Sequence, residues 1–320
     1  MLPMPNPNLP TAHGAGNSAR GAPWNYQLLA MAGRLYPFYS GSTRLTQSGL
    51  WSTLAKPEQT LTWCRGPGGM MLVPLDDFVG RCIYFPGDYD LKISALCGRI
   101  VKPGDTVLDI GANLGVVALN LARLAGPKGV VHAFEPNPRM RSLLAKSIAR
   151  NKYEHLHLHP MALGTQNEML ELHIPRNNAG QGSFIYHKDV VGHDVVQTPV
   201  RTLNEVVREQ GIGRIRLIKI DVEGFENEVL LGGMEVLETM RPDFLLLETN
   251  EACAAPLKQL PVVRTLQRAR YRMMAIPKTM LAPSVVAVDA NLRGQSPSHD
   301  IVAVPEERYE QFSRQLSVNG

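Results

Sequence analysis

The stretch Val107–Gly115, VLDIGANLG, decides the fold. A short apolar run, Thr106–Ile110, leads into a glycine-containing turn, and Leu114–Ala125 follows with the apolar spacing of an amphipathic helix. Gly111 removes a Cβ where the backbone turns sharply, and Gly115 allows the following helix to approach. We therefore predict a strand, a ligand-binding loop and a helix at the carboxyl edge of a parallel sheet.

The same alternation of elements extends to both sides of this unit. We expect seven main strands, at Thr106–Ile110, Val130–Phe134, His155–Met161, Arg216–Ile220, Phe244–Leu247, Arg272–Ile276 and Ile301–Val304, and a further strand at Met169–Ile174. We expect helices at Leu91–Ile100, Leu114–Ala125, Arg139–Arg150, Asn204–Gln210, Glu226–Met240 and Pro261–Ala269. This order predicts an α/β fold with a mostly parallel sheet and helices on both faces. The last two strands have no helix between them and are expected to pair antiparallel at the sheet edge.

The chain divides by pattern into an N-terminal extension (1–75), a core domain (76–308) and a C-terminal tail (309–320). Residues 1–23 are rich in Pro, Asn, Gly and Ala and are expected to be disordered. A hairpin is expected at Thr60–Pro74, around the turn sequence GPGG.

Trp24–Leu35 in the extension has helical apolar spacing and is expected to pack on the core. Binding of this helix to a membrane surface or a partner is the alternative. Arg34 is the one charge in this stretch, which is weak for attraction to lipid.

Composition limits the class of protein. With 320 residues and 44% hydrophobic content the chain can bury a full core, and a net charge of +4 without a Lys/Arg-rich block gives little support to nucleic-acid binding. No apolar run reaches the roughly 18 residues of a membrane span, and the N-terminus lacks the apolar segment of a secretory signal. The four cysteines form no CxxC pair. We therefore expect a cytoplasmic protein with reduced thiols and without bound metal; its oligomeric state is left open.

An acidic residue follows the second strand. Glu135 lies about 20 residues beyond the glycine loop, where an acid accepts hydrogen bonds from ribose hydroxyls in nucleoside-binding α/β folds. Pro136 stiffens the turn after it. A turn that binds nothing is the alternative to a ligand site. A dinucleotide needs the pattern G-x-G-x-x-G to hold two phosphates, whereas the sequence here is GANLG, so a nucleoside without phosphates is favoured.

Acidic residues also gather at a later strand end. Lys219, Asp221 and Glu223 alternate along the chain and start on one face of a strand, and Glu248 ends the next one. Asp221 or Glu223 is predicted to position or deprotonate a substrate, with Lys219 tuning their charge. The alternative for Glu223, and more so for Glu226, is a cap on the following helix. A Mg²⁺ site formed by Asp221, Glu223 and Glu248 is a less favoured alternative.

Histidines offer two further hypotheses. His155, His157 and His159 share one strand face, which is more typical of an exposed face than of a metal site. The Gly- and Asn-rich stretch Asn177–His193 is expected to cover the acceptor site, where His187 or His193 could act as a base.

Five ordered blocks carry a family resemblance. DIGANLG, FEPNP, MALG, RTLNEV and IKIDVEGFENEVLLGG, within about residues 85–305, resemble the FkbM family of methyltransferases. The resemblance implies a class I methyltransferase fold, Rossmann-like with a seven-stranded sheet, and S-adenosylmethionine as cofactor. It also implies O-methylation of a hydroxyl on a sugar or small metabolite. The first 75 residues or so match no part of the family core.

The resemblance also implies roles for individual residues. The glycine loop would line the methionine and ribose of the cofactor, Glu135 would hold the ribose hydroxyls, Ala162 would lie near the adenine and Asp221 would face the reactive methyl. Asp90, in FPGDYD, stands where the family usually has a longer Glu. The predicted cofactor-binding residues are Asp90, Asp109, Gly111, Ala112, Asn113, Gly115, Glu135, Pro136, Ala162 and Asp221, and the predicted catalytic residues are Lys219, Asp221, Glu223 and Glu248.

Three alternatives to O-methylation stay open. An amine acceptor needs less help from a base, so N-methylation is the nearest one. A non-catalytic protein that binds S-adenosylmethionine in an assembly is the second, and a dehydrogenase is the third. We expect a small-molecule or glycan acceptor and no nucleic-acid partner, and the sequence does not identify the acceptor.

Overall fold

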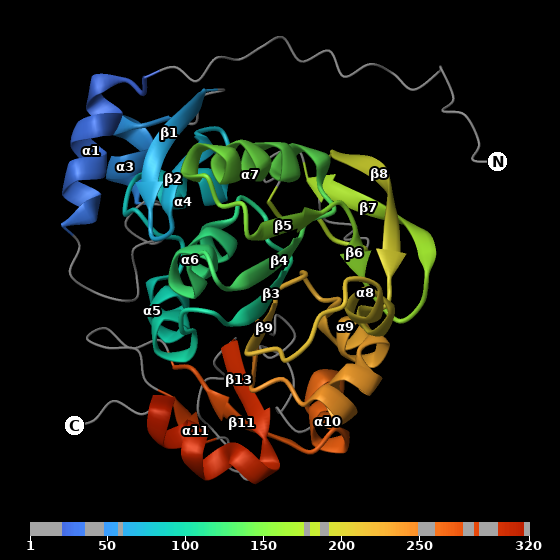
Figure 1. Ribbon diagram of the computed structural model, residues 1–320. Coiled ribbons are helices and arrows are strands. Elements are labelled where there is room, and N and C mark those ends of the chain that lie inside the picture. The colour runs from blue at the N-terminus through green and yellow to red at the C-terminus, as the bar shows by residue number, and fades with distance from the viewer. Residues whose placement is uncertain are drawn as a thin grey trace.

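A large twisted sheet with helices on both faces forms the centre of the computed structural model (Figure 1). The structure describes residues 21–35, 48–56, 60–175, 180–185, 192–248, 260–277, 285–287 and 300–316. Of the segment expected to be disordered, residues 1–20 lie outside these ranges. No helix in the described part of the chain is long and apolar enough to cross a membrane.

The large sheet has the strand order and directions of a class I methyltransferase fold. In spatial order its strands are β12 (Val286–Ala287), β11 (Tyr271–Ala275), β13 (Asp300–Pro305), β10 (Phe244–Glu248), β9 (Leu217–Ile220), β3 (Thr106–Ile110), β4 (Val130–Phe134) and β5 (Leu156–His159). The pairs from β10 to β5 are parallel, and β13 is antiparallel to both of its neighbours. The predicted α/β fold is confirmed, with the two-residue β12 added to the seven main strands. The order reverses between β3 and β9, so their carboxyl ends open a crevice.

Alternating strand residues face two separate cores. Val107 and Leu217 belong to a core beneath α4 (Phe78–Tyr84), α5 (Leu91–Ile100), α6 (Val116–Ala125), α7 (Pro138–Asn151) and α11 (Tyr309–Leu316). Leu108 and Ile218 belong to the core beneath α8 (Leu203–Glu209), α9 (Glu226–Gly232) and α10 (Pro261–Arg268). Asp109 and Lys219 lie on the first side, so two charges enter a layer of mostly apolar side chains.

Two elements differ from expectation. The antiparallel pairing of the last two strands is confirmed, but β13 inserts between β10 and β11 instead of lying at the edge. The helix expected over Glu226–Met240 is interrupted after Gly232, and a π-helical turn follows at Val236–Met240. A Cβ on Gly232 would lie 1.9 Å from the carbonyl oxygen of Gly164, so the chain approaches too closely for a longer side chain there.

A second, three-stranded sheet leads into the site. It orders β6 (Ala162–Leu163), β8 (His193–Arg201) and β7 (Glu168–Pro175), and β7 pairs antiparallel with β8. β7 confirms the further strand expected at Met169–Ile174, whereas β8 was not expected. Its sequence, HDVVQTPVR, contains Pro199, which disfavours a strand when the sequence is read alone.

The N-terminal extension packs on the core domain. The expected helix is α1 (Trp24–Arg34), and the expected hairpin consists of β1 (Leu61–Gly66) and β2 (Gly69–Pro74), which pair antiparallel. A short helix, α3 (Gly49–Leu54), lies between them in sequence. Helix α7 holds the hairpin, because the hydroxyl of Ser147 accepts the amide of Leu72 in β2 at 3.0 Å.

Candidate functional site

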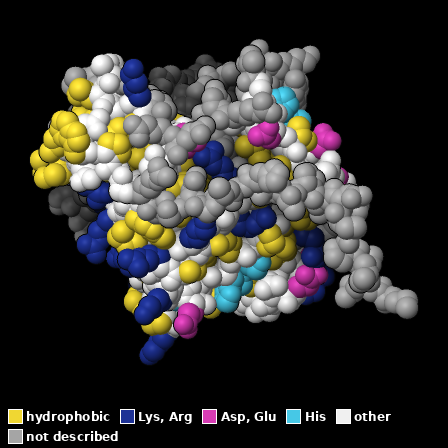
Figure 2. Space-filling view, turned by 90° about the horizontal axis from the view of Figure 1, so that it is seen from above, with side chains coloured by type: hydrophobic (Ala, Val, Ile, Leu, Met, Phe, Trp, Pro, Cys, Tyr) yellow, Lys and Arg dark blue, Asp and Glu magenta, His cyan; other side chains and the backbone are white. Residues whose placement is uncertain are grey.

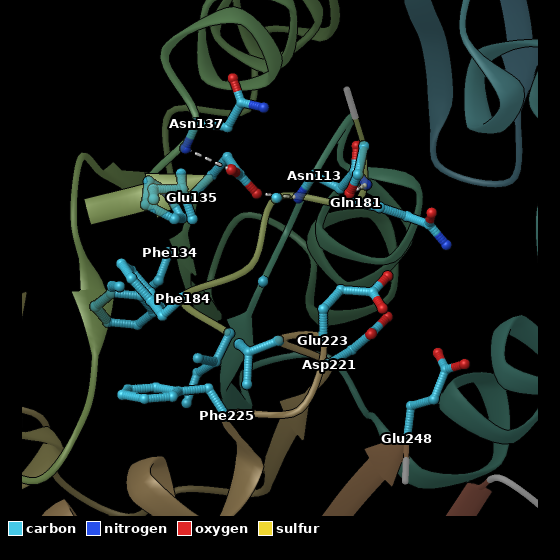
Figure 3. A pocket seen from close by; sticks show the side chains of 18 of the residues that line it. Asn113, Phe134, Glu135, Asn137, Gln181, Phe184, Asp221, Glu223, Phe225 and Glu248 are labelled. Atoms are coloured by element: carbon cyan, nitrogen blue, oxygen red, sulfur yellow. Dashed lines mark hydrogen bonds between the residues drawn. The ribbon is translucent and has the colours of Figure 1, made fainter. Parts of the chain in front are cut away.

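A cavity opens at the carboxyl ends of β3, β4, β9 and β10. It encloses about 860 Å³ of empty space, part of it open to solvent. Aromatic and aliphatic side chains form one side, and the carboxylates of Asp221, Glu223 and Glu248 lie on the other (Figure 3). The lining residues are Phe78, Val79, Tyr89, Ile110, Gly111, Asn113, Phe134, Glu135, Pro136, Asn137, Met161, Ala162, Leu163, Leu172, Gly180, Gln181, Gly182, Phe184, Asp221, Val222, Glu223, Phe225 and Glu248.

The glycine loop is fixed tightly between two strands. The amides of Gly111 and Ala112 donate to the carbonyl of Phe134 at 3.0 and 2.9 Å. Gly111 has φ +80°, and a Cβ there would lie 1.8 Å from the carbonyl oxygen of Asp221. Glycine is therefore required at this position both by backbone conformation and by the approach of the β9 end.

Glu135 connects the two turns at the cavity wall. Its Oε2 accepts the amide of Asn113 at 2.6 Å and its Oε1 accepts the amide of Asn137 at 2.7 Å (Figure 3). The side chain is buried, and burial raises the pKa of Glu135 to about 7, against the effect of these amides. Each oxygen keeps a second lone pair, so the carboxylate can still accept two hydroxyls from a ligand.

A buried ammonium group holds the acids of β3 and β9. Nζ of Lys219 lies 3.4 Å from Oδ1 of Asp109 and 3.1 Å from Oδ2 of Asp221, and donates to the carbonyl of Gly111 at 3.1 Å. Asp109 is fully buried, and burial raises its pKa while Lys219 opposes that effect. Lys219 therefore ties the glycine loop to the strand end that carries Asp221.

Asp221 acts electrostatically on the end of β10. Its charge, together with burial, raises the pKa of Glu248 to about 9. Glu248 thus keeps its proton at neutral pH and can donate a hydrogen bond to a ligand. The phenol of Tyr89 lines the same side, and its pKa is raised by burial and by these carboxylates.

Glu223 occupies a strained turn after β9. Its φ is +52°, an uncommon value for a residue with a side chain, and Gly224 follows with φ +96°. Glu226 stabilises this turn, because its Oε1 accepts the amides of Val222 and Gly224, each at 3.1 Å. Glu226 therefore stabilises the turn before α9, whereas the N-cap of this helix, Phe225, makes no side-chain hydrogen bond of the kind that the capping alternative would require, and the turn leaves Glu223 lining the cavity.

Residues 180–185, which we name the strap, form part of the cavity wall. The carbonyl of Gly180 accepts Nδ2 of Asn113 at 3.0 Å, and its amide donates to Asp77 at 3.3 Å. Ser183 exchanges two backbone hydrogen bonds with His173, at 2.9 and 3.0 Å. Its hydroxyl donates to the carbonyl of Glu223 at 3.1 Å. The strap belongs to the stretch predicted to cover the acceptor site.

The structure brings eight of the predicted residues to the cavity. These are Gly111, Asn113, Glu135, Pro136, Ala162, Asp221, Glu223 and Glu248. Asp109, Ala112, Gly115 and Lys219 support it from behind: Gly115, with φ +86°, is the N-cap of α6 and packs against Leu144. Asp90 does not line the cavity, because its carboxylate caps α5 and lies 3.3 Å from Lys92.

Several lining residues were not predicted. Phe184 and Phe225 lie with ring centroids 5.2 Å apart and form the apolar side together with Phe134, while Tyr89 lies on the acidic side. Tyr89 belongs to FPGDYD, where the sequence suggested a ligand role only for its neighbour Asp90. Phe184 follows a Gly-rich stretch, so no periodicity marks it.

None of the described histidines lines the cavity. Nε2 of His159, on the edge strand β5, lies 3.0 Å from Nδ1 of His132 on β4. His157, also on β5, is exposed. His193 contacts His173 and does not line the cavity, and His187 lies outside the described residues. Within the described ranges, no group of three or more His, Cys, Asp or Glu side chains has the arrangement of a metal site, Asp221, Glu223 and Glu248 included.

Comparison with known proteins identifies the family. The family model described as the methyltransferase FkbM domain matches residues 109–273, about half of the chain. The chain belongs to the FkbM methyltransferase family. The match begins at Asp109 in the glycine loop and includes Glu135, Asp221 and Glu248, so the cavity lies mostly within the family domain.

Curated FkbM relatives match over part of their length. The chain is 29% identical over 154 residues to 2-O-methyltransferase NoeI of Sinorhizobium fredii, covering 44% of this chain and 62% of that protein. It is 30% identical over 162 residues to 31-O-demethyl-FK506 methyltransferase FkbM of Streptomyces tacrolimicus, covering 42% and 62%. The chain thus spans about three fifths of the length of these relatives. The solved methyltransferase FkbM of Methylobacillus flagellatus has 13% identity and a TM-score of 0.39, covering 87% of this chain and 58% of that one.

Proposed function

We propose that this protein transfers the methyl group of S-adenosylmethionine to a hydroxyl of a small molecule or glycan. The observation that carries the proposal is the carboxylate of Glu135, held by the amides of Asn113 and Asn137 in the wall of the cavity. Its free lone pairs suit two vicinal hydroxyls of a ribose. Membership of the FkbM family supports methyl transfer. The names of the two curated relatives describe O-methylation, which supports an oxygen acceptor.

The cavity fits S-adenosylmethionine in both shape and charge. Gly111 provides a backbone surface without a Cβ, and the apolar side formed by Phe134, Leu163 and Phe225 suits an adenine ring. The opposite side carries Asp221 and further carboxylates, which suit a sulfonium cation. When bound, the cofactor supplies an activated methyl group that undergoes in-line displacement.

The carboxyl groups of the cavity have different roles at the acceptor. An alcohol must be oriented and must lose its proton as the new C–O bond forms. Asp221 or Glu223 accepts that proton, and Glu248, protonated at neutral pH, donates a hydrogen bond that orients the acceptor. Lys219 holds Asp221 in place through the 3.1 Å contact.

A second candidate, N-methylation, is favoured by one observation. The cavity is lined by four acids and, among its described lining residues, by no Lys, Arg or His. Such a wall also suits an amine that binds as a cation and loses its proton before transfer. Loss of a carboxylate would then reduce turnover less than for an alcohol.

The test is a methyl-transfer assay with labelled S-adenosylmethionine against fractionated cell extracts, followed by mass identification of the product. Formation of S-adenosylhomocysteine together with an O-methylated product supports the proposal, and an N-methylated product supports the second candidate. Thermal melting with S-adenosylmethionine and, separately, with NAD shows which cofactor stabilises the fold. Binding of S-adenosylmethionine without transfer to any fraction would mark a non-catalytic binding protein, and stabilisation by NAD alone would overturn the proposal.

A further inference from the structure

The outer face of α1 exposes a row of large apolar side chains. Trp24, Leu28, Met31 and Leu35 follow one another at intervals of four, three and four residues, so they share one face of the helix. Their exposed fractions are 75%, 56%, 66% and 82%. Leu54 of α3 is 46% exposed and lies beside the row, because its carbonyl accepts Nδ2 of Asn25 at 2.6 Å. We name these five residues the α1 stripe.

The stripe is held outward because the other face of α1 is packed. Tyr26, Ala30 and Gly33 are buried there, and a Cβ on Gly33 would lie 2.9 Å from the carbonyl oxygen of Phe85. The ring of Tyr26 lies 5.7 Å from that of Phe85. The helix is thus apolar on two faces, and packing on the domain uses only one. The stripe accounts for half of the large hydrophobic side chains that the described residues expose, which marks an interaction site.

Tertiary packing brings further cations to α1. The guanidinium of Arg34 donates to the carbonyl of Arg65 at 3.0 Å on the flank of the helix, and the hydroxyl of Tyr26, on the packed face, donates to the carbonyl of Lys56. The side chains of Arg34, Lys56 and Arg65 are all exposed. Residues 1–75 contain five Lys and Arg against one Glu, a local net charge of +4 that equals the net charge of the whole chain. Figure 2 shows hydrophobic side chains gathered at the edge where α1 lies, with Lys and Arg visible on the same face.

We propose that the α1 stripe docks on the surface of an anionic lipid bilayer. A short helix with Trp and Leu on its apolar face and cations at its borders has the chemistry that lies in a membrane interface. The cations complement the charge of acidic lipid headgroups, and this adds to the burial of the stripe. The sequence shows only Arg34 on the helix itself, whereas the fold adds Arg65 beside it and brings the exposed Lys56 close to the packed face of the helix.

A second copy of the chain is a poorer occupant of the stripe. An 11-residue helix is about 16 Å long, so a dimer formed through the stripe alone would lie at the lower limit of the roughly 600 Å² that each partner of a stable dimer buries. Two facing stripes would also bring like charges together. A lipid surface needs no matching partner face and attracts the cations.

Vesicle flotation with the full chain tests the proposal. We expect binding to vesicles of phosphatidylcholine mixed with phosphatidylglycerol, weak binding to phosphatidylcholine alone, and release at high salt. The double variant Leu28→Gln, Met31→Gln should lose binding at least tenfold. Reversing Lys56 and Arg65 to Glu should reduce it by about fivefold or more for each residue.

Matched variants control for surface changes as such. Met169→Gln removes an apolar side chain of the same exposure (58%) on β7, and Arg268→Glu reverses an exposed charge on α10, at the opposite end of the molecule from α1 (Figure 1). Both should bind like the unmodified protein, and circular dichroism checks that every variant is folded.

Three outcomes would overturn the proposal. One is no binding to anionic vesicles, and another is binding that survives loss of the stripe. The third is a dimer, seen by sedimentation without lipid, that the double variant abolishes, since it would assign the stripe to a second copy. No readout uses methyl transfer, so the result is independent of the proposed function.

Discussion

Oε2 of Glu135 accepts the backbone amide of Asn113 at 2.6 Å, so an acid from the end of β4 fixes the loop that follows β3. The same side chain lines the cavity. Loop geometry and ligand binding therefore depend on one carboxylate. This relationship makes Glu135 the most informative position for testing the cofactor site.

Glu135→Gln should weaken binding of S-adenosylmethionine about 10- to 100-fold. The amide nitrogen of Gln cannot accept a backbone N–H, and the charge that strengthens the hydroxyl contacts is lost. Titration calorimetry measures the effect, with Glu154→Gln, at an exposed position, as the control. Unchanged affinity would remove Glu135 from the ligand site.

The affinity of the unmodified protein should also depend on pH. Burial raises the pKa of Glu135 to about 7, and ribose hydroxyls donate to the ionised form. Binding should therefore strengthen as the pH rises through about 7 and weaken as it falls. Below that value Glu135 is protonated and must release its proton before the ribose hydroxyls can donate to the carboxylate. The same titration of Glu135→Gln should lack this dependence. A pH-independent affinity in the unmodified protein would contradict the assignment.

Gly111→Ala should destabilise the protein and abolish cofactor binding. An L-residue in the left-handed region costs about 1–2 kcal/mol, and here the new Cβ would also overlap the carbonyl of Asp221. Gly104→Ala is a close control, since Gly104 has φ +92° but no atom within 4 Å of its Cβ position. Thermal melting should show a clearly larger loss for Gly111→Ala. Equal losses would mean that backbone strain alone matters and that the close approach does not.

Local motifs were sufficient to predict the acidic residues of this site. Glu135 and Asp221 follow short apolar strands, and parallel strands place their carboxyl ends at one edge, so their meeting could be predicted. Lys219 precedes Asp221 by two residues, and its contact with Asp109 follows from the parallel pairing of β3 with β9, in which these two are register partners.

Residues contributed by irregular segments could not be predicted in this way. Phe184 and Tyr89 reach the cavity through segments without periodicity, whose course depends on contacts remote in sequence. For Asp90 the position in a motif suggested a ligand role. In the structure its carboxylate caps α5 and does not line the cavity. Lys56 likewise gains its place beside α1 only through a tertiary hydrogen bond from Tyr26.

Lys219→Met should destabilise the fold by about 3–5 kcal/mol at neutral pH. The change leaves Asp109 fully buried without its neighbouring cation. The loss should shrink as the pH falls, because the pKa of Asp109 is raised by burial and rises further without Lys219, so the folded variant takes up a proton more readily than the unfolded chain. Denaturant unfolding at several pH values measures this, with Lys102→Met, at an exposed position, as the control. A loss that does not vary with pH would contradict this account.

Ser183→Ala should lower turnover about five- to tenfold while leaving the affinity for S-adenosylmethionine within about twofold. The hydroxyl donates to the carbonyl of Glu223 and accepts the amide of Ile185, both at 3.1 Å, so its loss releases the strained turn that presents Glu223. Ser183→Thr keeps the hydroxyl and should restore turnover. If both variants match the unmodified protein in kcat and KM, the strap does not position Glu223.

Asp221→Asn should reduce turnover by about 10²- to 10⁴-fold with S-adenosylmethionine binding still measurable, since it removes the base and keeps the shape of the side chain. It should also lower the pKa of Glu248 from about 9, because the charge of Asp221 is the main cause of that shift. Carboxyl titration by nuclear magnetic resonance follows Glu248, and labelled methyl transfer follows turnover. A lowered Glu248 pKa with full activity would show that the pair is coupled as described but that Asp221 is not the base, and the role would then pass to Glu223. Full activity with an unchanged Glu248 pKa would contradict both the coupling and the catalytic assignment.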